Sequence, residues 1–389
     1  WRISEEPFMS NIEAIDNLKI RASYGEMGND AVSAFQYLMA YSYGSNYVLG
    51  NSDVVGLVQS GTPNPNITWE VAKTTNFGIE STLWKGLLGI EFDVFKTRRS
   101  NILTKRNAVV PDYTGLTLPD ENIGIVDNKG FELQLSHKNT VKKLIYSLNG
   151  NFSFARNKVV FADEAPAAEE YQLATGRPIG STLRYHAIGI FKDIEEINGY
   201  PHFTGAVPGD IKYEDTNKDG VLNSRDQIRI NETAIPEIVY AFNASLEYKN
   251  FDLSVLFQGQ ANAQVYFGSY YQVMSYSLGN FTQWREKDHW SPTNTDATMP
   301  RASIELWNNN ANNVNSDHWQ IDSDFLRLKN LELGYSLPSS ITNKMKIQNF
   351  RVYASGNNLL ILFDHMKEGG FDPETTSYWW YPQQRVINV

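Results

Sequence analysis

Residues 215–226 carry oxygen-bearing side chains at a spacing that suits a calcium ion. Oxygens stand at the first, third and fifth positions, Gly220 permits a sharp turn at the sixth, and a carboxylate closes the twelfth. This order matches the loop that wraps six to eight hard oxygen ligands around Ca²⁺. The predicted ligands are Asp215, Asn217, Asp219, the carbonyl of Val221, and Asp226.

Two features of the same loop favour a different interpretation. The twelfth position holds Asp226 rather than the longer glutamate that binds calcium through both oxygens. The flanking residues 211–213 and 227–230 are typical of strands, whereas the calcium loop usually joins two helices. An Asx-rich turn that caps itself without a metal therefore stays open beside the calcium site. If calcium binds, its role would be to rigidify a long outer loop.

Aromatic side chains gather in two late stretches of the chain, where asparagine and glutamine are interleaved with them. Flat rings beside amide donors suit the faces of sugars or a peptide backbone. The alternative for each residue is that it packs the loops together or contacts a partner protein. The candidate ligand-binding residues are Tyr270, Tyr271, Trp284, Trp307, Trp319, Trp379 and Trp380.

Signals of catalysis are poor. The six histidines form no pair at metal-binding spacing, and no nucleophile elbow, phosphate-binding loop or dinucleotide fingerprint occurs. The sequence therefore predicts no catalytic residue and a protein that is not an enzyme.

Composition narrows the class of protein. A net charge of -10 disfavours a nucleic-acid partner, and the lack of cysteine excludes disulfides and thiolate metal sites. Aromatic residues make up 13% of the chain, which fits the aromatic girdles of a membrane barrel or a sugar-stacking surface. No apolar run approaches the roughly 18 residues that a membrane-spanning helix needs.

Residues 74–98 predict the hairpin on which the fold class depends. Phe77, Ile79, Phe92 and Val94 fall on one face, and polar or small residues such as Glu80 fall on the other. A period of two means opposite faces of a sheet. One apolar and one polar face suits a transmembrane barrel strand, and it also suits the outer layer of a soluble β-sandwich.

Loop lengths favour the barrel over the sandwich. A strand over 17–25 is followed by a long loop at 26–68, and three further hairpins are predicted over 131–154, 240–257 and 325–358. Their turns are short, whereas the connections between hairpins, at 99–129, 155–237 and 260–324, are long. Short turns at one rim and long loops at the other are typical of outer-membrane barrels, and a sandwich has no reason to sort loops in this way.

Short motifs throughout the chain resemble the SusC/RagA branch of the TonB-dependent transporters. Their order and spacing together are specific, although each is weak alone. The motifs are 18–25 with Gly28-Asn29, Asn64-Pro65-Asn66 with Trp69-Glu70, 122–124, 128–132, 208–213, 248–253 with 257–259, 326–330 with Gly334-Tyr335 and Leu337-Pro338, 351–353 with 356–359, 371–374 and 381–385.

The resemblance implies an all-β fold, an antiparallel transmembrane β-barrel with long extracellular loops and short periplasmic turns. Residues 1–389 would form the C-terminal part of a 22-stranded barrel, with the N-terminal plug and early strands outside this chain. It also implies a bacterial outer-membrane importer of oligosaccharides or peptides that works with a SusD-like surface lipoprotein. TonB would act through the absent N-terminal part, and membrane lipid would surround the barrel.

Two alternatives remain at this stage. The chain is long enough for a self-closed barrel of about 14–16 strands. It is also compatible with a soluble, secreted, calcium-stabilised β-protein that acts on glycans as a lyase or hydrolase, which predicts glycan cleavage by the purified protein.

Overall fold

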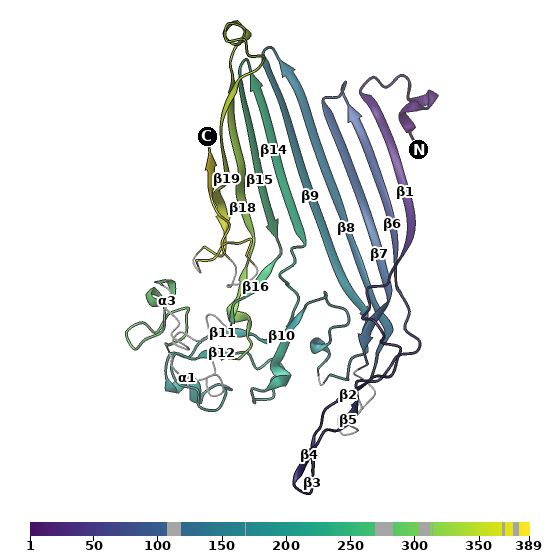
Figure 1. Ribbon diagram of the computed structural model, residues 1–389. Helices are drawn as coiled ribbons and strands as arrows, with labels where there is room; N and C mark the ends of the chain where they lie inside the picture. Colours follow the sequence, from purple (N-terminus) through teal and green to yellow (C-terminus); the bar gives the residue numbers. More distant parts are fainter. Residues whose placement is uncertain are drawn as a thin grey trace.

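A computed structural model describes residues 1–106, 118–167, 169–268, 283–302, 312, 314–367, 370–375 and 381–389. One antiparallel sheet of ten strands dominates it, in the order β1-β6-β7-β8-β9-β14-β15-β18-β19-β20. Neighbours in the sheet are neighbours in the sequence, so the strands form a continuous meander (Figure 1). Within this chain the sheet is open, with β1 and β20 at its two edges.

The strands of the sheet are long because the alternating pattern runs past the length that a bilayer needs. A tilted transmembrane strand takes roughly 9–11 residues, whereas β8 has 22. The ten strands are β1 (Ile15–Asn29), β6 (Glu70–Leu83), β7 (Leu88–Lys105), β8 (Asp120–Val141), β9 (Leu144–Phe161), β14 (Ile238–Tyr248), β15 (Phe251–Ala261), β18 (Phe325–Ser336), β19 (Arg351–Asp364) and β20 (Val386–Asn388).

All four predicted hairpins are confirmed, as β6–β7, β8–β9, β14–β15 and β18–β19. The turn between β14 and β15 has two residues, because Tyr248 pairs with Phe251. The pair Lys249-Asn250 suits a two-residue turn whose second residue tolerates a positive φ. In the structure the positive φ falls on the first residue, Lys249, at 55°. Asn250 instead uses its side-chain amide to donate a 2.7 Å hydrogen bond to the carbonyl of Ser336 on β18.

Loop length alternates as predicted. Residues 84–87, 142–143 and 249–250 are short connections of two to four residues, and they lie with the longer connection 337–350 at one end of the sheet (Figure 1). The connections from β1 to β6, β7 to β8, β9 to β14 and β15 to β18 leave and rejoin the sheet at the other end. Three of them have 40 residues or more, whereas the connection from β7 to β8 has fourteen, as 337–350 does. These ends are called the short-turn end and the long-loop end below.

The strand register collects apolar side chains into rows on one face of the sheet. Phe77, Val94, Phe131 and Phe154 are direct cross-strand neighbours. The face is uncovered, and Phe77, Val94, Phe242 and Leu333 are 46%, 45%, 44% and 52% exposed. Soluble proteins rarely expose an apolar surface that runs across a whole sheet, whereas the lipid-facing side of a barrel does so. The predicted transmembrane pattern is therefore confirmed. A sandwich would require a second sheet over this face, and the described residues form none there.

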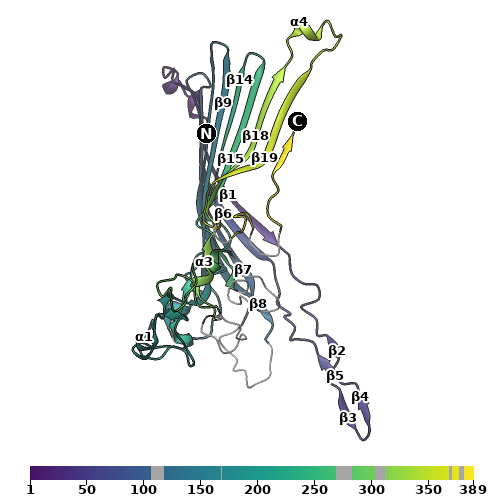
Figure 2. The same cartoon turned by 90° about the vertical axis from the view of Figure 1, so that its left-hand side faces the viewer.

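The hydrophobic core lies in the loops, at the long-loop end. Residues 162–237, 262–324 and 365–375, as far as they are described, form a folded unit that we call the cap (Figures 1 and 2). Small antiparallel strand pairs build it, and Phe267 stacks on Phe371 with ring centroids 4.5 Å apart. Its buried members are Tyr185, Ile211, Tyr213, Leu222, Val265, Phe267, Met299, Trp319 and Met366.

The remaining elements are short. Residues 41–59 form one interrupted hairpin, in which the β3–β4 pair continues the β2–β5 pair, and it projects from the long-loop end (Figure 2). No helix in the described part of the chain is long and apolar enough to cross a membrane. The short strands are β2 (Tyr41–Tyr43), β3 (Tyr47–Leu49), β4 (Ser52–Val54), β5 (Leu57–Gln59), β10 (Thr182–Tyr185), β11 (Ala187–Ile190), β12 (Ile211–Tyr213), β13 (Gln227–Ile230), β16 (Gln264–Tyr266) and β17 (Gln320–Asp322). The helices are η1 (Ile3–Glu5), η2 (Pro7–Met9), η4 (Glu170–Gln172), α1 (Ile194–Asn198), η5 (Ser224–Asp226), α3 (Gln283–Lys287), η8 (Asp317–Trp319) and α4 (Ser339–Thr342).

Candidate functional site

The polar face of the sheet is the first candidate surface. Side chains one residue out of step with the apolar rows line a hollow of about 370 Å³ across β7, β8, β9 and β14. Its polar lining consists of Glu91, Asp93, Glu132, Gln134, Asn151 and Ser153. The carboxylates, amides and hydroxyl offer hydrogen-bonding groups to a hydrated ligand or to another protein segment.

Cations from β1 balance part of this acidic surface. Arg21 contacts Glu80 at 3.0 Å and Asp93 at 2.7 Å, and Lys19 contacts Glu80 at 3.2 Å. No group of three His, Asp or Glu side chains in the described chain is placed to hold a metal ion. The arrangement can bind and orient polar groups.

The cap is organised around Asp210, whose carboxylate joins three loop segments. It accepts hydrogen bonds from Arg301 Nε at 2.7 Å, Asn312 Nδ2 at 3.0 Å and the backbone N–H of Val207 at 3.0 Å. Asn312 in turn accepts from the N–H of Ile211 at 2.7 Å. Burial raises the pKa of Asp210, while these donors and the Arg301 charge oppose that rise.

Gly209 allows its own segment to approach Trp290 and Arg301 closely. Its φ is +90°, and a Cβ here would lie 2.5 Å from the Trp290 ring and 2.7 Å from Cβ of Arg301. Any larger residue would push these segments apart.

A second buried ion pair fixes the segment that follows β19 onto β18. Arg327 contacts Asp372 at 2.7 Å and Glu374 at 3.4 Å, and the Arg327 and Asp372 side chains are 2% and 8% exposed. Lys329 completes the group by contacting Glu374 at 2.7 Å. The motifs at 326–330 and 371–374, which the sequence marks separately, are therefore in direct contact.

His318 is a partly buried titratable group of the cap. Burial lowers its pKa to about 4, and the nearby charge of Arg285 acts in the same direction. Its Nε2 has no hydrogen-bond partner among the described residues, and its ring lies edge-on to Trp319 with centroids 4.6 Å apart.

We expect the stability of the cap to fall as the pH drops from 6.5 toward 4. The unfolded chain takes up a proton on His318 near its ordinary pKa of about 6.5, and the folded chain does not, so the stability present above that pH is lost below it. The loss reaches roughly 3 kcal/mol at the acid end. Thermal melts of the full-length protein across this range should show a smaller decrease for His318→Gln than for the wild type. Equal decreases would contradict the assignment.

The predicted calcium ligands lie in a tightly hydrogen-bonded loop of the cap. Asp215 accepts from the backbone N–H groups of Asp219, at 3.2 Å, and Gly220, at 2.9 Å, and Asp219 accepts from that of Val221 at 2.9 Å. Asn217 accepts from the N–H of Asp219 at 3.1 Å. Asp226 is fully buried and accepts from the N–H groups of Thr216, at 3.0 Å, and Asn223, at 2.7 Å. These bonds are those of an Asx turn that caps itself. They do not test calcium binding, which stays a prediction.

Of the seven candidate aromatic residues, only Trp319 has its backbone and side chain within the described part of the structure. Trp319 is 2% exposed, donates from Nε1 to the carbonyl of Asn312 at 3.2 Å, and packs in the core of the cap. Trp284 belongs to helix α3, and its side chain lies outside the described part. The other candidates, Tyr270, Tyr271, Trp307, Trp379 and Trp380, lie outside the described residues.

A curved antiparallel sheet with an uncovered apolar face, a polar opposite face and loops sorted by length defines the class of transmembrane β-barrels. Residues 10–359 match the family model described as TonB dependent receptor-like, beta-barrel. The chain belongs to that family. Its sheet forms a section of such a barrel.

Known relatives agree with this assignment. The chain is 30% identical to TonB-dependent receptor P3 of Formosa agariphila, over 96% of this chain and 37% of that protein. It is 23% identical to TonB-dependent receptor SusC of Bacteroides thetaiotaomicron, over 97% of this chain and 37% of that protein. The fold is similar to that of the RagAB peptide importer in its 'open-open' state, with a TM-score of 0.74, 20% identity, and coverage of 96% of this chain and 39% of that one. The chain thus spans less than two fifths of these relatives.

Proposed function

We propose that this chain forms part of the wall of a bacterial outer-membrane importer that takes up oligosaccharides or peptides. The main observation in favour of this function is the uncovered apolar band on one face of the sheet, opposite a polar face with an acidic hollow. Membership of the TonB-dependent receptor-like family supports the same function. In this proposal the apolar face meets lipid, the polar face lines the lumen, and the long-loop end is extracellular.

The proposal includes two protein partners and no chemical step. A SusD-like lipoprotein would lie over the cap, whose folded core gives it a defined surface, and TonB would act through a segment outside this chain. RagAB, with which this chain shares its fold, is described as a peptide importer, which supports peptides as one substrate class. The barrel would bind and pass its ligand without breaking bonds, so no catalytic residue is assigned.

Deletion of the full-length gene tests this function. We expect the deletion strain to lose uptake of a labelled oligosaccharide or peptide, and uptake to return with the intact gene but not after dissipation of the proton gradient. The intact protein should require detergent for extraction and should carry a surface lipoprotein through purification. A full-length protein that is soluble without detergent, or that cleaves a glycan when purified, would overturn the proposal and favour the soluble glycan-active alternative.

We further propose that Ca²⁺ stabilises residues 215–226, which rests on the oxygen spacing. About 1 mM Ca²⁺ should raise the melting temperature of the full-length protein over that in chelator, as it does for weak extracellular sites. Asp219→Asn should abolish this rise, and Asp53→Asn, in the small hairpin of β3 and β4, should not. Identical melting temperatures with Ca²⁺ and with chelator would leave the self-capped turn as the interpretation.

A further inference from the structure

The apolar band ends abruptly at the long-loop end, and basic residues replace it on the same face. In β7, β8 and β9 the residues two positions beyond Val94, Phe131 and Phe154 are Lys96, Lys129 and Arg156. The register makes Lys96 a direct neighbour of Lys129, and Lys129 a direct neighbour of Arg156. Because side chains two apart on a regular strand share a face, these cations continue the lipid-facing rows.

A second row beyond the first adds further charge. Arg98, Asp127 and Lys158 are cross-strand neighbours there, and Arg98 holds Asp127 through bonds of 2.6 and 2.8 Å. Arg156 is likewise paired, with Glu237, through bonds of 2.7 and 2.6 Å. Lys96, Lys129 and Lys158 are exposed, and none of them makes a hydrogen bond or ion pair with a described residue. We call these three side chains the lysine triad.

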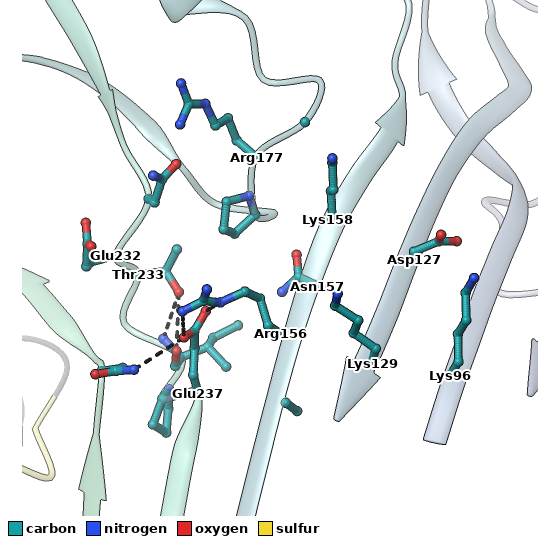
Figure 3. A pocket seen from close by; sticks show the side chains of 17 residues that line it. Lys96, Asp127, Lys129, Arg156, Asn157, Lys158, Arg177, Glu232, Thr233 and Glu237 are labelled. Carbon is teal, nitrogen blue, oxygen red and sulfur yellow. Dashed lines mark hydrogen bonds and ion pairs between the residues drawn. The ribbon is translucent and has the colours of Figure 1, made fainter. Parts of the chain in front are cut away.

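A hollow of about 610 Å³ adjoins the triad, where β9 parts from β14. Lys96, Lys129 and Lys158 line it from the strands, and Arg177 lines it from the segment that follows β9. Figure 3 shows the three lysines on neighbouring strands beside the Arg156–Glu237 ion pair, with Arg177 across the hollow. Like charges directly opposite each other destabilise a sheet. Five cations, including Arg156, and three carboxylates, Asp127, Glu232 and Glu237, line the hollow. Asp127 and Glu237 are held by Arg98 and Arg156. The lining therefore keeps an excess of positive charge, which an anion would neutralise.

The height of the triad on the barrel indicates which anion. On β9 the apolar face runs from Leu144 to Phe154, about ten steps of ~3.3 Å, or about 25 Å across a membrane at the usual strand tilt of about 40°. This equals the height of the lipid-facing band of outer-membrane barrels, so Lys129 and Arg156 lie at the level of the lipid headgroups. The chain as a whole has a charge of -10, so the basic rows are a local departure from its composition.

We propose that the lysine triad, with Arg177, binds the phosphate groups of an anionic lipid in the outer leaflet. This inference rests on the membrane placement proposed above. The lipid tails would cover the apolar rows that end at Phe131 and Phe154, and the headgroup phosphate would enter the hollow. Ammonium and guanidinium groups are the usual partners of phosphate, and each lysine near a charged lipid surface contributes roughly fivefold to binding.

Native mass spectrometry of the full-length protein in detergent tests this proposal, with diphosphoryl lipid A and its dephosphorylated form as probes. The variant is Lys96→Gln/Lys129→Gln/Lys158→Gln. The matched control, Lys138→Gln/Lys142→Gln/Lys143→Gln, removes the same charge at the short-turn end. We expect the triad variant to retain the phosphorylated lipid at least about tenfold less than the wild type, and the control to match the wild type. The dephosphorylated lipid should bind all three proteins equally.

Other outcomes separate the possible explanations. Equal retention of the phosphorylated lipid by the triad variant and the wild type would overturn the proposal, and so would its complete displacement by inorganic phosphate. If the triad variant loses both lipid forms equally, binding does not depend on the phosphate groups and is assigned to the apolar band alone. This outcome would leave the membrane placement intact and would rule out the phosphate site. The single variant Lys129→Gln, at the centre of the row, provides the same comparison if the triple variant fails to assemble, as judged by heat-modifiable migration of the barrel.

Discussion

Asp372→Ala is expected to lower the free energy of unfolding by roughly 3–5 kcal/mol. The substitution leaves the guanidinium of Arg327 buried without its closest carboxylate, which lies 2.7 Å away in the wild type. It also removes the acceptor that Asp372 provides for the backbone N–H of Glu374 at 3.0 Å. Glu374 remains 3.4 Å from Arg327, but it is already shared with Lys329.

Urea unfolding of the full-length protein in detergent, followed by tryptophan fluorescence, measures this loss. Glu26→Gln is the matched control, because it removes one carboxylate from the exposed Lys73–Glu26 pair, whose atoms are 3.5 Å apart. Such surface pairs contribute below about 1 kcal/mol. The double variant Arg327→Met/Asp372→Leu should recover most of the stability, because it replaces the buried pair with apolar groups. A single variant as stable as the control would show that the pair does not anchor the segment.

Leu135→Arg is the second substitution with a large expected effect. Leu135 lies on the apolar face near the middle of the band, where its cross-strand neighbours are Ile90 and Gly150. An arginine on the lipid face near the membrane midplane costs roughly 2–4 kcal/mol in a barrel of this kind. We expect a matching loss of stability in lipid vesicles and less assembled protein in the membrane.

The adjacent residue supplies the control for this substitution. Gln134 points to the polar face, where it lines the hollow beside Glu91 and Asn151. Gln134→Arg places the same side chain one residue away among polar groups, so its cost should stay below about 1 kcal/mol. If both variants lose equal stability, or if the loss is larger for Gln134→Arg, the assignment of lipid and lumen faces is wrong.

The sequence indicated some of the residues that hold the cap together, but not the contacts between them. Asp210, Arg327 and Asp372 each fall within a motif of the resemblance, so the sequence marked them as positions of interest. It did not indicate that Arg327 reaches Asp372, 45 residues away, or that Asp210 meets Arg301, 91 residues away. Trp319 shows the same limit. A tryptophan suits a ligand-binding surface as well as a packed core, and only its burial in the structure shows that it packs in the core.

The strands, their two faces, the four hairpins and the placement of the long loops were all predictable from the amino-acid order. These are local properties: the side-chain period of a strand is two, and each hairpin joins neighbouring segments, so both can be read along the chain. Three features became visible only in the folded chain: the long loops form a cap, Lys249 rather than Asn250 takes the positive φ, and Lys96, Lys129 and Lys158 lie beside one hollow. Packing between irregular segments and the alignment of distant strands depend on register and shape, and neither leaves a periodic pattern in the amino-acid order.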